Sequence, residues 1–243
     1  MRGTMLTAFL MVILLAGPAM ANGYSSQFKA FDFGLKGGVN LADLEFDPDE
    51  EVDWESFLRF GGGATLGFNI TPTFGLDLDV LYMMKGAKFE GDFSDFLIED
   101  DPGYDDISCG GEARIELDYL VVKPMLRFTP IQGGASPYLL LGGEIGYLLD
   151  AKQVFEATCD LDPPVEIDEE EDFTDVVKDL DFGLNVGAGL EFPVGNMSMI
   201  IEGHYSLGLA NIYDADEDEE ATEDEEDLSV KTRGIYGFVG LRF

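Results

Sequence analysis

The only histidine of the chain, His204, stands at alternating positions between a carboxylate, Glu202, and a hydroxyl, Ser206. These are the three groups of a hydrolase triad, in which a base activates a nucleophile. At i, i+2 and i+4 of a strand, however, their side chains lie in a row on one face, and no oxyanion hole accompanies them. His204 also lies near the middle of its strand. We therefore interpret it as a hydrogen-bonded interior histidine, and we expect no enzyme activity.

A second candidate site is an acidic run near the C-terminus that matches a calcium-loop spacing. Positions 1, 3, 5, 7, 9 and 12 of that spacing are Asp214, Asp216, Asp218, Glu220, Thr222 and Glu225. The glycine expected at position 6 is Glu219 instead, and any run this acidic matches the pattern by chance. A solvated or loosely ion-screened loop is the favoured prediction. The alternative is Ca²⁺ or Mg²⁺ held by Asp214, Asp216, Asp218, Glu220 and Glu225, and no other cofactor is expected.

The two cysteines, Cys109 and Cys159, are the remaining reactive groups. An exported protein with two cysteines most simply pairs them. We expect a disulfide between them that joins two neighbouring external loops, and free thiols are the alternative.

Export is indicated by the start of the chain. One positive charge, Arg2, precedes the apolar run Met5–Ala16, and the sequence Ala19-Met20-Ala21 follows it. This order predicts a secretory signal peptide over residues 1–21, and the run is shorter than the ~20 residues of a spanning helix. Residues 22–243 are expected to form one domain.

Eight segments of this domain alternate between apolar residues and small or polar ones, which predicts β-strands. In one of them, Phe182 and Leu184 face one way while Asp181 and Gly183 face the other. The segments are approximately residues 31–44, 58–70, 74–88, 114–128, 138–149, 180–192, 197–211 and 231–243. Strands of about ten residues match the length that a tilted strand needs to cross a bilayer.

Aromatic residues near the strand ends are consistent with membrane-interface girdles, namely Phe74, Phe128, Tyr138 and Tyr147. The last strand ends on Phe243, as bacterial barrels commonly do, which predicts recognition by the barrel-assembly machinery.

The connections between these segments alternate in length. Three are short (69–73, 129–137 and 193–196) and four are long and acidic (about 45–57, 89–113, 150–179 and 212–230). Short periplasmic turns that alternate with long external loops are typical of outer-membrane barrels. The sequence therefore predicts an all-β protein, a transmembrane up-and-down antiparallel β-barrel of about eight strands, in the cell outer membrane of a Gram-negative-type bacterium.

The negative charge belongs to the long connections. The formal net charge is −35, and 39 of the 49 acidic residues fall in those four segments. We expect contacts with outer-membrane lipid and lipopolysaccharide, and an external protein or cation as a further ligand. No basic patch for nucleic acid is present, and a monomer is expected.

Alternation also predicts which charged side chains point into the barrel. With His204 they form an expected lumen charge network: Asp32, Lys36, Arg59, Asp77, Asp79, Lys85, Lys123, Arg127, Glu144, Asp181, Glu191, Glu202 and Arg242. Seven acids against six bases is close to balance. Because side chains just fill the interior of eight strands, a plugged barrel is favoured over an open channel.

Several of these strands resemble the PorT-like, porin-family outer-membrane β-barrel domain. The resemblance rests on Phe33–Leu41 (FGLKGGVNL), Asp79–Ala87 (DVLYMMKGA), Pro137–Gly143 (PYLLLGG) and Tyr205–Leu209 (YSLGL), and it extends from about Phe31 to Phe243. The chain departs from that pattern at Pro124, which stands one place later than expected, and in its long acidic loops. The resemblance implies a small barrel whose relatives include porins and structural, adhesive and resistance proteins.

Together these features predict a non-enzymatic integral outer-membrane protein with a structural or surface role. Its acidic loops are expected to bind divalent cations or external partners. The alternative is a narrow cation-preferring porin for small solutes, whose acidic mouth concentrates cations. Cation-selective conductance that disappears when Asp77 and Asp79 are neutralised would support it.

Overall fold

The computed structural model describes residues 29–47, 55–93, 108–160, 164–213 and 229–243. Nine strands form one antiparallel sheet over these ranges: β1 (Phe31–Asp47), β2 (Phe57–Asn69), β3 (Phe74–Asp92), β4 (Cys109–Phe128), β5 (Ser136–Cys159), β6 (Val165–Asp172), β7 (Leu180–Val194), β8 (Met197–Gly208) and β9 (Ser229–Arg242). One short 3₁₀ helix, η1 (Thr174–Val176), precedes β7. The predicted signal peptide (1–21) and much of the predicted loops lie outside the described residues.

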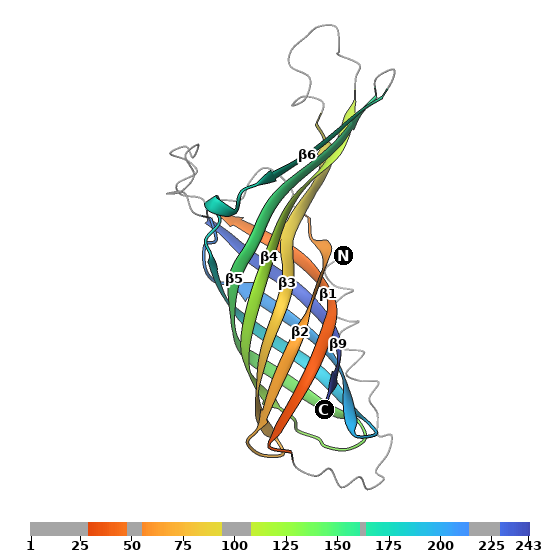
Figure 1. Cartoon of the computed structure of the whole chain (residues 1–243), viewed down its shortest axis with the longest axis vertical. Coiled ribbons are helices and arrows are strands. Elements are labelled where there is room, and N and C mark those ends of the chain that lie inside the picture. The colour runs from red at the N-terminus through yellow and green to blue at the C-terminus, as the bar shows by residue number, and fades with distance from the viewer. Residues whose placement is uncertain (1–28, 48–54, 94–107, 161–163, 214–228) are drawn as a thin grey trace.

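Eight of the strands close into a barrel (Figure 1). The ring runs β1-β2-β3-β4-β5-β7-β8-β9 and returns to β1, and β6 pairs only with β5. The first and last strands pair along fourteen positions, from Gly34 opposite Arg242 to Asp47 opposite Ser229. The predicted all-β barrel of about eight strands is therefore confirmed. In the described part of the chain, no helix has the length and apolar character needed to cross a bilayer.

The outer face of the ring is apolar because alternate residues of every strand point outward. Many of these outward side chains are exposed in the isolated chain, for example Leu35, Leu66, Leu141, Val186 and Val239. Apolar surface of this extent is stable only against lipid.

Aromatic side chains border this surface at the end of the barrel where the short turns lie, which we call the turn end. Phe31 packs on Phe68 and Phe74 on Phe128, with ring centroids 5.1 Å apart in both pairs. Tyr138 does not belong to this girdle, although the sequence predicted it there. Its side chain is buried in the lumen because it lies on the inward face of β5, where its hydroxyl donates to Glu202.

Three barrel strands continue far beyond the ring at the opposite end (Figure 1). The last pair between β5 and β7 joins Tyr147 to Leu180, whereas β5 runs on to Cys159, which is about 40 Å of further strand. Strands β3 and β4 accompany it, and β6 adds a fourth strand on the other side of β5. We call this four-stranded extension the arm, made of residues 86–93, 109–117, 150–159 and 165–172.

The arm corrects the prediction of two long loops over 89–113 and 150–179. Those segments contain the distal parts of β3, β4 and β5 and all of β6. Within their described parts, most of the acids lie on one face of a regular sheet, so this charge marks an exposed strand face rather than irregular chain.

Gly86 stands where β3 leaves the barrel wall and enters the arm. Its φ of 134° lies in a region that L side chains rarely adopt, and an added Cβ would lie 1.9 Å from the carbonyl oxygen of Ile115. Only glycine allows β3 to remain paired with β4 at this bend.

Candidate functional site

The barrel lumen holds most of the predicted charge network as paired ions. Nine of these side chains are between 0 and 3 % exposed: Lys36, Asp77, Asp79, Lys85, Lys123, Glu144, Asp181, Glu202 and Arg242. Burial of an isolated charge costs several kcal/mol, so each ion depends on its partner. Three groups of ion pairs follow one another along the lumen.

The group nearest the turn end is built on two arginines. Arg242 lies 2.5 Å from Asp77 and 3.4 Å from Asp32, and Arg127 lies 3.3 Å from Asp77. Arg127 also reaches Glu191 at 3.5 Å. Asp32 and Glu191 are only partly buried, since they lie at the rim of the barrel.

The middle group surrounds Glu202. Lys36 Nζ lies 2.7 Å from Glu202 and 2.6 Å from Asp79, and the Tyr138 hydroxyl donates to Glu202 over 2.7 Å. His204 Nε2 lies 3.1 Å from the same carboxylate, and its Nδ1 lies 2.8 Å from Asn185 Oδ1. Arg242 of the first group also lies 4.0 Å from Glu202, so this carboxylate has four polar partners in a closed interior.

The group nearest the arm is built on two lysines. Lys85 Nζ lies 2.7 Å from Glu144 and 2.9 Å from Asp181, and Lys123 Nζ lies 2.9 Å from Glu144. Lys123 Nζ also lies 4.3 Å from the centre of the Tyr236 ring. Aromatic faces attract cations in this geometry, so the ring and Glu144 together stabilise the buried ammonium.

Ser206 and His204, two of the three groups that a hydrolase triad would need, contact different partners. The Ser206 hydroxyl donates to Glu144 over 2.9 Å, whereas His204 contacts Glu202 and Asn185. The His204 ring also packs edge-on against Phe238 at 5.5 Å. Ser206 is therefore not hydrogen-bonded to His204 in the described contacts, and the carboxylate that it does contact is paired with Lys85 and Lys123, so the three residues do not form the hydrogen-bonded chain of a triad.

Arg59 is the one predicted lumen charge that pairs outside these three groups. It lies 2.9 Å from Glu116 and 3.3 Å from Asp118, two acids on β4 near the base of the arm. Strand β2 pairs with β3 only as far as Gly61 opposite Met83, so Arg59 lies where the two strands have parted.

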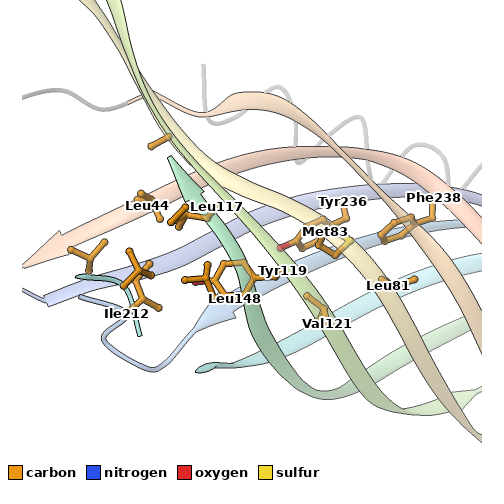
Figure 2. Close-up of a cluster of buried hydrophobic side chains, with 14 residues drawn as sticks. Leu44, Leu81, Met83, Leu117, Tyr119, Val121, Leu148, Ile212, Tyr236 and Phe238 are labelled. Carbon is orange, nitrogen blue, oxygen red and sulfur yellow. The ribbon is translucent and has the colours of Figure 1, made fainter. Parts of the chain in front are cut away.

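An apolar cluster closes the lumen at the arm end (Figure 2). We call it the plug, and its buried members at this end are Leu44, Ala87, Leu117, Leu148, Ala151, Val177, Ile212 and Val230. Figure 2 shows the same cluster continuing down the lumen through Tyr119, Met83 and Tyr236 to Phe238. Sequence alternation did not identify the plug, because β4 carries apolar residues on both faces around Tyr119.

Two connecting segments fold inward to complete the plug. Val177, just after η1, forms a bridge with Tyr213, and Ile212 N donates to Val230 O over 2.9 Å. The Thr174 hydroxyl accepts a hydrogen bond from Ala151 N at 3.0 Å, which holds η1 against β5. The apolar residues of the first segment divide between two elements, since η1 ends at Val176 and β7 begins at Leu180.

One face of the arm is mostly charged, and the other face is mostly apolar over β3, β4 and β5. Directly opposed residues of antiparallel strands point to the same side, so Glu90, Glu112, Glu156 and Asp168 form one row across all four strands. These four carboxylates repel one another, and basic side chains of the neighbouring row offset the repulsion in part. Arg114 contacts Glu112 and Glu156, and Lys88 contacts Glu90, whose carboxyl pKa this hydrogen bond lowers.

The other face of the arm contains three phenylalanines and the cysteines. The Phe93 ring lies 4.9 Å from Phe155 and 5.5 Å from Phe89. Cys109 and Cys159 form a disulfide with a Cα–Cα distance of 4.0 Å. They are the first residue of β4 and the last of β5, so the disulfide joins two paired strand ends rather than two loops, because the strands extend further than predicted.

The candidate calcium residues, Asp214, Asp216, Asp218, Glu220 and Glu225, lie outside the described residues. Within the described ranges, no three His, Cys, Asp or Glu side chains are grouped so as to hold a metal ion. The C-terminal residue, Phe243, lies at the turn end, where its N–H donates to Phe33 O over 2.8 Å and its ring stacks on that of Phe33.

The model of a family described as outer membrane protein beta-barrel domain matches residues 20–214. Solved structures are also similar. Neisserial surface protein A has 12% identity and a TM-score of 0.43, with 88% of this chain and 96% of that chain covered. OprG from Pseudomonas aeruginosa has 14% identity and a TM-score of 0.40, with 88% of this chain and 97% of that chain covered. The outer membrane protease OmpT from Escherichia coli has 9% identity and a TM-score of 0.31, with 90% of this chain and 98% of that chain covered. No curated protein matches the sequence.

Proposed function

Because the chain belongs to the outer membrane protein beta-barrel domain family, we propose that it is a sealed, non-enzymatic barrel whose arm meets partners outside the cell. The protein lies in the outer membrane of a Gram-negative-type cell, where lipid covers its apolar outer face. The arm end then faces outward, as the alternation of short and long connections predicts.

The filled lumen is the observation that carries this proposal. A water path through the barrel would touch the charged side chains that line it, yet the side chains of Lys123 and Glu202 are 0 % exposed. The plug lies between these ion pairs and the arm end, and it adds an apolar barrier to the passage of water and solutes. Eight strands enclose little more than their own side chains, which favours a sealed barrel on general grounds.

The alternative, a narrow cation-preferring porin, would use Asp77 and Asp79. Both carboxylates are buried and each is paired with a cation, Asp77 with Arg242 and Asp79 with Lys36. A carboxylate that is already neutralised attracts a passing cation weakly, so these pairs favour the sealed barrel.

The separation of Ser206 from His204 supports the non-enzymatic part of the proposal. Divalent cations that screen the acidic external segments remain part of the proposed surface role, and a raised melting temperature in millimolar Ca²⁺ would support it.

Single-channel recording of the refolded mature protein in a planar bilayer tests the sealed barrel. We expect no conductance from protein that circular dichroism shows to be folded. The matched control is the variant Tyr119→Ala with Tyr236→Ala, which removes two large lumen rings and changes no charged side chain. That variant should show conductance steps. Stable cation-selective steps from the native protein that disappear in Asp77→Asn with Asp79→Asn would overturn the sealed barrel in favour of the pore.

A further inference from the structure

The outermost strand of the arm, β6, has one unpaired edge. It pairs with β5 from Lys152 opposite Asp172 to Cys159 opposite Val165, and no described strand lies on its other side. About half of its eight residues turn both backbone groups away from β5, as antiparallel geometry requires. Seven of these eight residues are exposed. A free edge of this kind is a template for another extended chain.

The charge of β6 restricts which chain can pair with it. Six of its residues are acidic, and on the arm as a whole only Lys88, Arg114 and Lys152 are basic. Lys152 contacts Glu170 at 2.7 Å, while Lys88 and Arg114 contact acids of β3, β4 and β5. Within the described part of the chain, Glu166, Asp168, Glu169 and Glu171 form no ion pair.

The row of carboxylates across the arm ends on β6 without a cation. Like charges directly opposite one another destabilise a sheet, and Asp168 is the last of the four in that row. A fifth strand paired with β6 would place a side chain directly beside Asp168 on the same face. A lysine or arginine there would neutralise the end of the row.

A shallow hollow on the arm adds room for such a side chain. It is lined by Glu112, Glu156, Thr158, Glu166 and Asp168, over the backbone of Gly110 and Gly111. An added Cβ at Gly110 would meet no atom within 4 Å, so the hollow is open to solvent.

We propose that β6 binds a basic extended segment of a partner by adding it to the arm as a fifth antiparallel strand. This inference rests on the proposed surface role. The β6 strand of a second copy does not fit as the occupant, because it would set six acids against six. The partner carries lysine or arginine at alternate positions opposite Glu166, Asp168 and Glu170. Near the distal end of β6, its other face carries apolar side chains, beside Val165 and Ile167.

The probe is the peptide Lys-Val-Lys-Val-Lys-Val-Lys-Val, titrated into the full chain in nanodiscs of zwitterionic lipid at physiological salt. The first control is the same peptide with alternate amides N-methylated, which keeps the charge and removes hydrogen-bond donors. We expect its binding to be at least about tenfold weaker, because it cannot complete the ladder. We also expect the unmodified peptide to slow amide hydrogen exchange across residues 165–172.

The matched protein variants carry equal changes in charge. Glu166→Gln with Asp168→Asn removes two charges that would face the basic side chains of the partner, while Glu45→Gln with Asp179→Asn removes two charges outside the arm. We expect the first set to weaken peptide binding roughly tenfold and the second set by much less, since exposed ion pairs act over short range in salt.

Equal binding of both peptides, equal loss in both variants, or no protection at residues 165–172 would each overturn the edge-pairing proposal. The conductance recording on the same preparation separates this failure from failure of the proposed function. If the protein does not conduct and does not bind the peptide, only the proposal of edge pairing by β6 is refuted. If the protein conducts, the sealed surface role is refuted.

Discussion

Carboxylates occur both in the lumen and on the arm, and the two regions differ in how each charge is neutralised. In the lumen, Glu144 contacts Lys85 and Lys123 and is almost fully buried. On the arm, Glu156 of the same strand contacts Arg114 and is 52 % exposed, with two further carboxylates directly opposite it in the sheet. The lumen charges are arranged to stabilise the barrel, whereas the arm charges remain available to a ligand.

Removing one lumen charge should have the largest effect. Glu144→Gln leaves Lys85 and Lys123 buried with too little negative charge, and we expect it to destabilise the folded barrel by about 3–5 kcal/mol. Urea unfolding in lipid vesicles, followed by circular dichroism, measures this change. The matched variant Glu156→Gln lies on the same strand in solvent and should change stability by less than about 1 kcal/mol. Equal losses of unfolding free energy in the two variants would show that lumen and arm carboxylates contribute equally to stability.

The second test asks whether the arm opens independently of the barrel. In the variant Cys109→Ser with Cys159→Ser, the paired ends of β4 and β5 lose their covalent link. We expect faster amide exchange over residues 109–116 and 152–159, equivalent to about 2–4 kcal/mol of lost protection, and an unchanged barrel melting temperature. A fall in the melting temperature would instead mean that arm and barrel unfold as one cooperative unit.

The smallest effect concerns the junction between the arm and the plug. The Thr174 amide donates to Asp172 Oδ1 over 3.0 Å, and this hydrogen bond lowers the pKa of the Asp172 carboxyl below its ordinary 3.8. Because the folded pKa is depressed, the stabilisation is complete above pH 3.8 and is lost as the pH falls through the folded pKa. The Thr174 amide resonance should therefore shift and its exchange accelerate in that acid range. Asp172→Asn should show neither change, while a shift that persists in this variant would assign it to another acid.

Period-two alternation was sufficient to predict the eight barrel strands and the inward direction of residues such as Lys36, Lys85 and Glu144. It could not predict their pairing, because the stagger between neighbouring strands decides which charges meet at one level of the lumen. Lys85 on β3 thus meets Asp181 on β7, although these strands are not neighbours in the ring.

Strand β6 was missed for a different reason. Its sequence, VEIDEEED, has apolar residues only at its first and third positions, so most of it reads as a solvated acidic loop. Its extended state comes from pairing with the edge of β5, which is a tertiary effect that local preference does not contain. The arm as a whole was concealed in the same way, because the acids of one face hid the alternation of Phe89, Gly91 and Phe93.

The bend at Gly86 has a mechanical consequence for a protein fixed in a membrane. Strands β3 and β4 pair without a break from the barrel wall into the arm, so the arm does not swing like a domain on a linker. A barrel spins about the membrane normal and does not tumble, and the arm leaves it to one side (Figure 1). Each spin therefore carries the free edge of β6 around the barrel axis, so that one molecule presents this edge in every direction parallel to the membrane.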